Sequence, residues 1–149
     1  MDIALKLNPD KADIDAITVP LVAFNKARSG RDAGWQPFAL HLSDDAGAAV
    51  GGLSGWTVFD WMFIELFVVP ESLRGQGYGR ALMERAEAFA RERNCLGIWL
   101  DTFSFQARPF YEKLGFTVFG TIDDHPVGGH RYFLQKRLDQ PSTHPHETN

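Results

Sequence analysis

Residues 65–93 read ELFVVPESLRGQGYGRALMERAEAFARER: an apolar run, a polar turn, a glycine-rich loop and an amphipathic run follow without a break. The pattern predicts a buried strand, a loop and then a helix. Gly75, Gly77 and Gly79 let the loop backbone come close to a ligand. The first amides of a helix have no internal acceptor, and the helix dipole is positive at this end. The stretch therefore predicts a site for an anion, such as a phosphate group.

Two common phosphate-binding loops are excluded by the residues that follow the glycines. A P-loop ends in Gly-Lys followed by Ser or Thr, whereas this chain has Gly79, Arg80 and Ala81, with no hydroxyl for magnesium. A dinucleotide-binding loop needs a third glycine three residues after Gly77, and Arg80 stands there. Neither nucleotide-binding motif is present.

A different pattern, Arg/Gln-x-x-Gly-x-Gly/Ala, is met by Arg74, Gly77 and Gly79. It resembles the loop that binds the pyrophosphate of acetyl coenzyme A in the GNAT N-acetyltransferase superfamily. Residues 107–116, ARPFYEKLGF, resemble the superfamily's other signature, in which the helix carrying the tyrosine, here Tyr111, lies beside the sulfur of the coenzyme. The two signatures occur in the family's order, so the chain is identified as a member of this superfamily.

The resemblance implies an α/β (α+β) fold with a mixed, mostly antiparallel sheet and a parallel pair that splays where the coenzyme enters. Apolar periodicity predicts about seven strands and about four helices. The strands are expected at residues 3–7, 36–43, 48–58, 61–69, 96–103, 116–122 and 130–138. The helices are expected as two short ones within residues 10–28, with a corner near Val19 before Pro20, one after the glycine loop and one at residues 107–114. Gly51 and Gly52 predict a bulge or a close backbone approach.

Length and composition favour one domain over residues 1–138, because 149 residues with 44% hydrophobic side chains can fill one core. Residues 139–149 carry almost no apolar side chain and are predicted to be disordered. The net charge of −4 argues against a nucleic-acid partner. No signal peptide or membrane-length apolar run occurs, so we expect a soluble cytoplasmic protein. Cys95 is the only cysteine and is expected to be structural, and no metal site is expected.

The resemblance implies that acetyl coenzyme A is held by a bulged central strand and by the loop. The strand residues are Phe67, Val68 and Val69, the loop residues are Arg74, Gly75, Gln76, Gly77, Tyr78, Gly79 and Arg80, and Ser104 stands where the family usually has a coenzyme-contacting Asn. Arg74 could contact the pyrophosphate or cap the loop. Arg80 could be a phosphate ligand or a solvated residue of the first helical turn.

The implied reaction is direct attack by a primary amine on the thioester, in a ternary complex. The amide of Val69 would stabilise the oxyanion, and Tyr111 would donate a proton or a hydrogen bond to the departing thiolate. Tyr111 could instead only pack between aromatic neighbours. Glu65 lies in an apolar run, where burial would raise the pKa of a carboxyl toward the range of a base. Glu65 could instead be a partly exposed ion-pairing residue, and some family members use only a water chain as the base.

The acceptor is expected to be a small-molecule amine. The alternatives are an amine of a protein or peptide, and a catalytically inactive module that binds acyl coenzyme A as a sensor. Asp123, Asp124, His125 and His130 could line the acceptor pocket or be solvated turn residues. The aromatic-rich late strands could also form a homodimer surface.

Overall fold

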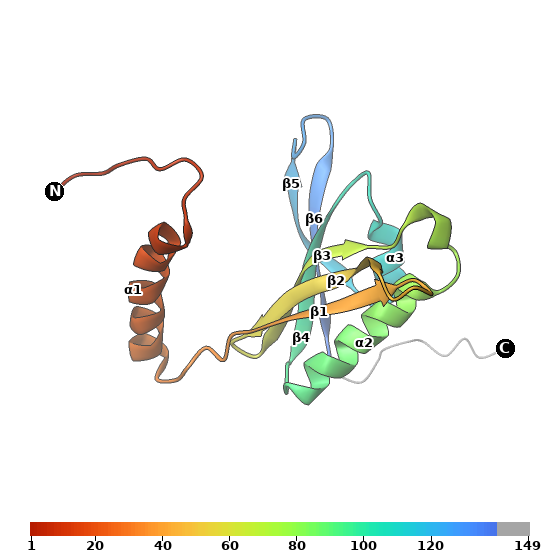
Figure 1. Cartoon of the computed structure of the whole chain (residues 1–149), viewed down its shortest axis with the longest axis horizontal. Helices are drawn as coiled ribbons and strands as arrows, with labels where there is room; N and C mark the ends of the chain where they lie inside the picture. Colours follow the sequence, from red (N-terminus) through yellow and green to blue (C-terminus); the bar gives the residue numbers. More distant parts are fainter. Residues whose placement is uncertain (140–149) are drawn as a thin grey trace. The chain divides into compact units, whose positions relative to one another are not determined.

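The computed structural model describes residues 1–139, and these fall into two compact units, residues 1–34 and the part from Trp35 onward (Figure 1). Apart from Asp139, the tail expected to be disordered lies outside the described residues. None of the helices found in residues 1–139 has both the length and the apolar character that crossing a membrane requires.

The first unit contains one continuous helix, α1 (Lys11–Ser29). Asp10 and Asp13 form a capping box at its start, and Gly30 ends it with a φ of 74°. The two short helices predicted around Pro20 are therefore wrong: α1 continues through the proline, which removes only one of its backbone hydrogen bonds. The strand predicted at residues 3–7 is also absent, since these residues pair with no other strand.

The second unit is built on a six-stranded sheet in the order β1-β2-β3-β4-β6-β5. The strands are β1 (Gln36–Ser43), β2 (Ala49–Val58), β3 (Trp61–Val68), β4 (Gly97–Phe103), β5 (Thr117–Asp123) and β6 (His130–Arg137). Only β3 and β4 pair in parallel, so the mixed, mostly antiparallel sheet is confirmed. The described residues hold six strands and three α-helices, because the strand at residues 3–7 does not form and α1 is one helix.

Helix α2 (Tyr78–Glu92) lies across one face of this sheet and packs against β1–β4 (Figure 1). A short 3₁₀-helix (Glu71–Leu73) precedes it, and α3 (Arg108–Lys113) follows β4. The buried stripe of α2 consists of Leu82, Met83, Ala86 and Ala90. The sheet contributes the fully buried side chains Met62, Ile98, Leu100 and Leu134. Burial of these apolar groups holds α2 on the sheet.

The parallel pairing of β3 and β4 is short. It runs from Trp61 with Gly97 to Ile64 with Leu100, and both strands continue beyond this pair. The register of β2 with β3 shifts so that Glu65 is an extra residue on β3. We expected the bulge near residues 67–69, and it lies earlier. The two strands thus form a fork that opens at residue 65.

Glycines bring the backbones of β1, β2 and β3 close together beside the bulge. Gly52 has a φ of 141°, and a Cβ there would lie 2.0 Å from the carbonyl oxygen of Leu40. A Cβ on Gly55 would lie 1.9 Å from the carbonyl oxygen of Phe63. The close approach predicted at Gly52 is confirmed, and larger side chains at positions 52 and 55 would push the strands apart.

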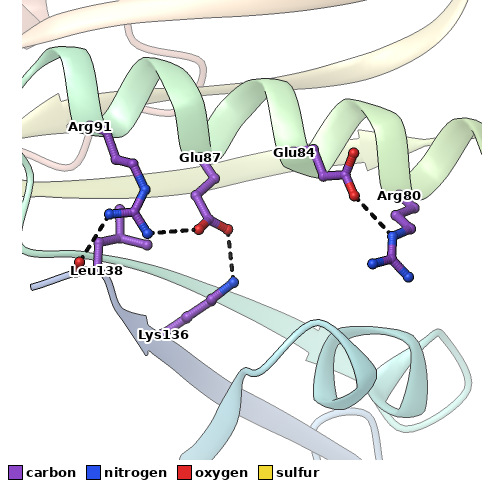
Figure 2. Close-up of polar contacts among 6 residues, drawn as sticks. All are labelled: Arg80, Glu84, Glu87, Arg91, Lys136 and Leu138. Carbon is purple, nitrogen blue, oxygen red and sulfur yellow. Dashed lines mark hydrogen bonds and ion pairs between the residues drawn. The ribbon is translucent and has the colours of Figure 1, made fainter. Parts of the chain in front are cut away.

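Ion pairs join α2 to the last strand (Figure 2). Glu87 accepts hydrogen bonds from Lys136 at 2.8 Å and from Arg91 at 3.1 Å, and Arg91 also donates to the carbonyl of Leu138 at 3.0 Å. Burial alone would raise the pKa of Glu87, but Lys136 and Arg91 outweigh it and the pKa falls below its ordinary value of 4.5. A carboxyl whose pKa is lowered by folding stabilises the folded state above its unfolded pKa.

We therefore expect Glu87→Gln to lower the free energy of unfolding at pH 7 by about 1 kcal/mol. The difference from the unmodified protein should shrink as the pH falls below 4.5, where the unfolded carboxyl becomes protonated, and vanish below the folded pKa. Urea unfolding between pH 3 and pH 7 measures it. Glu84→Gln is the control, because Glu84 pairs with Arg80 in solvent on the same helix. A pH-independent deficit for Glu87→Gln would contradict the ion-pair account.

Candidate functional site

The fork between β3 and β4 opens into a cleft of about 870 Å³. Most of the residues expected at the site line it: Glu65, Phe67, Val68, Val69, Arg74, Gly75, Gly77, Tyr78, Gly79, Arg80 and Tyr111. Gln76 and Ser104 do not. The cleft has a loop end, formed by the glycine loop and the start of α2, and an inner end, where the two strands separate.

The loop end presents unpaired backbone amides. Gly77 is the N-cap of α2 with a φ of 86°, and no side chain caps the helix there. The amides of Tyr78, Gly79 and Arg80 therefore have no acceptor from a capping side chain. No atom lies within 4 Å of where a Cβ on Gly75 or Gly77 would stand, so a ligand can approach this backbone. The geometry fits the pyrophosphate of a coenzyme.

The charged side chains of the loop have partners of their own. Arg74 Nε donates to the carbonyl of Val69 at 3.0 Å, which is the capping role considered for it. Arg80 Nε donates to Glu84 at 2.9 Å in an exposed pair. Gln76 donates to the carbonyl of Ser72 at 3.3 Å. The Nε groups of both arginines thus have acceptors within the protein, whereas no side chain caps the amides at the start of α2.

Tyr111 lies on α3 and is 6% exposed. Its ring centroid is 6.1 Å from that of Phe67, 5.2 Å from that of Phe110 and 6.1 Å from that of Phe116. Burial, with a smaller effect of the charge on Asp101, raises the pKa of Tyr111 to about 12. Tyr111 thus packs in an aromatic cluster and also borders the cleft, where its hydroxyl stays protonated and can donate a hydrogen bond.

Glu65 is the bulge residue of β3 and borders the inner end of the cleft. The burial expected for it is wrong: its side chain is exposed, although Ile64 beside it is buried. Alternation along β3 accounts for this difference, and the bulge interrupts it only at the next residue, where Leu66 is exposed as well. Exposure toward the cleft makes the carboxylate accessible to a bound molecule.

Ser104 and the residues of the late loop lie outside the cleft lining. The hydroxyl of Ser104 accepts a hydrogen bond from the amide of His130 at 3.1 Å and so joins β4 to β6. His130 Nδ1 lies 2.9 Å from the exposed carboxylate of Asp123. His125 contacts two residues of the cleft lining: its Nε2 lies 3.2 Å from Arg131 Nη1, and its ring packs edge-on against that of Phe103 at 5.3 Å.

Two charged residues of the inner end carried no role in the sequence analysis. Asp101 on β4 and Arg131 on β6 line the cleft, and Arg131 Nε donates to Asp101 Oδ1 at 2.8 Å. In the sequence, Asp101 could have been noticed as the charged residue inside the apolar run GIWLDTF, residues 97–103. Its partner lies 30 positions away and is brought near it by the pairing of β4 with β6.

Cys95 lies buried after α2, outside the cleft lining, and burial raises the pKa of its thiol. A thiol in this state is a poor nucleophile, which agrees with the structural role expected for it. Within residues 1–139, no three His, Cys, Asp or Glu side chains gather in a way that could hold a metal ion.

This chain is similar in sequence to known acetyltransferases. The profile of the acetyltransferase (GNAT) family matches residues 12–116. An acetyltransferase of Agrobacterium fabrum is 37% identical over 87% of this chain and 96% of its own length, and the blasticidin-S acetyltransferase of Streptomyces morookaense is 36% identical over 68% and 75%.

Solved structures match the fold as well. A crystal structure of an acetyltransferase from Agrobacterium tumefaciens has a TM-score of 0.86 and 36% identity, covering 93% of this chain and 100% of that one. A structure from Bacillus anthracis in complex with acetyl coenzyme A has a TM-score of 0.56 and 25% identity, covering 62% and 58%.

Proposed function

Because the chain belongs to the GNAT acetyltransferase family, we propose that it transfers the acetyl group of acetyl coenzyme A to a primary amine of a small molecule. The observation that carries the proposal is the cleft in the β3–β4 fork, which joins an uncapped helix N-terminus to a protonated tyrosine. The helix N-terminus binds an anion, and the tyrosine donates a hydrogen bond to a thiolate.

Acetyl coenzyme A lies along the whole cleft in this proposal. Its pyrophosphate is held by the amides of Tyr78, Gly79 and Arg80, and its pantetheine arm runs beside β3. Beyond Ile64, the edge of β3 that faces β4 is unpaired within the described sheet. A ligand with amide groups can pair with this edge as an added strand would.

The amides of β3 also face the reacting carbonyl in this arrangement. Phe67, Val68 and Val69 line the cleft, and Val69 lies just beyond the end of the strand, where Arg74 holds its carbonyl. The Val69 amide is the proposed oxyanion donor. A donor fixed in place before the reaction stabilises the developing charge without reorganisation.

Tyr111 acts on the departing sulfur in the proposed mechanism. Its pKa of about 12 lies above the value of about 8.5 typical of an alkyl thiol. Complete proton transfer from Tyr111 to the thiolate is therefore unfavourable, and a hydrogen bond is the useful interaction. The thiolate takes its proton from solvent after release.

Glu65 is the proposed base. The amine arrives as an ammonium ion and loses one proton to Glu65, directly or through a water molecule, before its nitrogen attacks. The C–N bond forms, the C–S bond breaks, and the electron pair of the broken bond goes to sulfur. The nitrogen loses a second proton, so an ammonium ion and the thioester give an amide, a thiol and one released proton.

The acceptor class is supported by the relatives. The blasticidin-S acetyltransferase of Streptomyces morookaense acts, by its name, on a small molecule, and it is 36% identical over 68% of this chain. The inner end of the cleft also carries the carboxylates of Glu65 and Asp101, which suit an amine that is cationic in water. A small-molecule amine is therefore favoured over a protein amine.

The test is a thiol-release screen with acetyl coenzyme A and a panel of polyamines, aminoglycoside-type antibiotics, amino acids and peptides. We expect rapid release with one or more small amines and little with peptides. Release with peptides alone would favour a protein acceptor. Binding of acetyl coenzyme A without release for any amine would favour an inactive binding module.

We expect Tyr111→Phe to lower kcat by about 10–100-fold, because one hydrogen bond to a charged group contributes about 1.5–3 kcal/mol. The Kd for acetyl coenzyme A should change little, since the phenyl ring preserves the packing against Phe67 and Phe110. Steady-state kinetics and calorimetry measure the two quantities. Full turnover in the variant would show that Tyr111 only packs.

A further inference from the structure

Two carboxylates stand where the fork begins. The last registered pair of β3 and β4 is Ile64 with Leu100, so Glu65 and Asp101 are the first residues beyond it on either strand. Both border the cleft. Paired strands lie about 4.8 Å apart, so the two side chains flank the narrow inner end of the opening.

Asp101 is held in place through one of its two oxygens. Arg131 Nε lies 2.8 Å and Arg131 Nη2 lies 2.7 Å from Asp101 Oδ1. Within residues 1–139, Asp101 Oδ2 accepts no hydrogen bond. The Asp101 side chain is 15% exposed. Oδ2 is therefore a fixed acceptor that a ligand in the cleft can use.

Arg131 is itself held on several sides. Its guanidinium carbon lies 5.4 Å from the ring centroids of both Phe103 and Phe133. Its Nη1 lies 3.2 Å from His125 Nε2, and because arginine can only donate, the histidine nitrogen accepts. The guanidinium therefore orients Asp101, and its positive charge is offset by that carboxylate.

The charge of Asp101 reaches the reaction centre. Burial is the larger cause of the raised pKa of Tyr111, and the negative charge of Asp101 adds to it. Asp101 therefore lies close enough to the hydroxyl of Tyr111 to act on it electrostatically. A cation bound at Asp101 Oδ2 would be a neighbour of the hydroxyl proposed to face the sulfur.

We propose that Asp101 binds the reacting amine as its ammonium ion through Oδ2, and that the enzyme thereby selects aliphatic amines that are cationic at neutral pH. The inference rests on the acetyl transfer proposed above. An alkyl amine has a pKa of about 10 and arrives with three N–H donors. Asp101 takes one of them in a charge-assisted hydrogen bond, and Glu65 takes a proton. Asp101 is a positioning residue that keeps its charge throughout.

An acceptor that carries a carboxylate fits the inner end less well. Arg131 is the cationic side chain there, and it is already engaged by Asp101 through Nε and Nη2 and by His125 through Nη1. A carboxylate ligand would compete with Asp101 for the guanidinium and would be repelled by the carboxylates of Asp101 and Glu65. The same side chains therefore favour a cation over an anion.

The test uses cyclohexylamine and aniline, which have rings of the same size, while only the first is cationic at pH 7. Kinetics with acetyl coenzyme A are measured for the unmodified protein, Asp101→Asn, the double variant Asp101→Asn with Arg131→Gln, and Glu65→Gln. Asp123→Asn is the matched control, because its carboxylate also pairs with a β6 side chain but lies outside the cleft.

We expect Asp101→Asn to raise KM for cyclohexylamine by about 10–100-fold and to change kcat/KM for aniline by less than about threefold. The Kd for acetyl coenzyme A should stay within about twofold, which also shows that the variant is folded. The double variant should behave like Asp101→Asn, Glu65→Gln should lower kcat rather than raise KM, and Asp123→Asn should behave as the unmodified protein.

The proposal would be overturned if Asp101→Asn left the ratio of kcat/KM for cyclohexylamine to kcat/KM for aniline unchanged. Recovery of that ratio in the double variant would overturn it too, because it would show that only the net charge of the cleft matters. If no amine at all gave thiol release, the result would contradict the proposed function instead.

A second measurement needs no variant. In the unmodified protein, the cyclohexyltrimethylammonium cation, which cannot be acetylated, should inhibit acetylation of cyclohexylamine competitively. Cyclohexanol, of similar size and neutral, should inhibit at least about tenfold more weakly. Equal inhibition by the two compounds would overturn the assignment of Asp101.

Discussion

The end of the hydrogen bonding between β3 and β4 is the constraint on which the rest of the structure depends. Pairing stops at Ile64 with Leu100, yet both strands continue, each hydrogen-bonded to a neighbour on its other side. The sheet therefore opens without losing its continuity. Backbone groups on the edge of β3 that faces β4 are left without a partner beyond Ile64 within the described sheet. A buried polar group without a partner is costly, so a ligand that supplies the missing hydrogen bonds is favoured there.

Aromatic packing joins β3 to α3 beside the fork. The ring of Phe67, on β3, stacks 5.8 Å from that of Phe110, on α3, and Tyr111 lies beside both. Gly79, at the start of α2, lies under this pair, since a Cβ there would be 3.3 Å from the ring of Phe110. The third glycine of the loop thus serves packing, while Gly75 and Gly77 serve the turn. The same cluster buries Tyr111, and this burial keeps its hydroxyl protonated.

Local sequence predicted the parts of the site that local chemistry determines. The glycine loop, the helix after it and the position of Tyr111 follow from short motifs, and the strand at residues 36–43 follows from alternation. The bulge at Glu65 and the end of the β3–β4 pairing beside it do not, because they depend on how β3 pairs with β2 and β4. Asp101 and Arg131 could not be paired from sequence for the same reason: their contact comes from strand register.

The central claim is that the thioester lies in the fork, with its pyrophosphate at the start of α2. Amide hydrogen exchange with and without acetyl coenzyme A tests this most directly. The account predicts slower exchange at residues 65–69, on β3 and just after it, and at residues 78–80 at the start of α2, with little change at residues 84–91 farther along that helix. Protection that leaves residues 65–69 unchanged would contradict it.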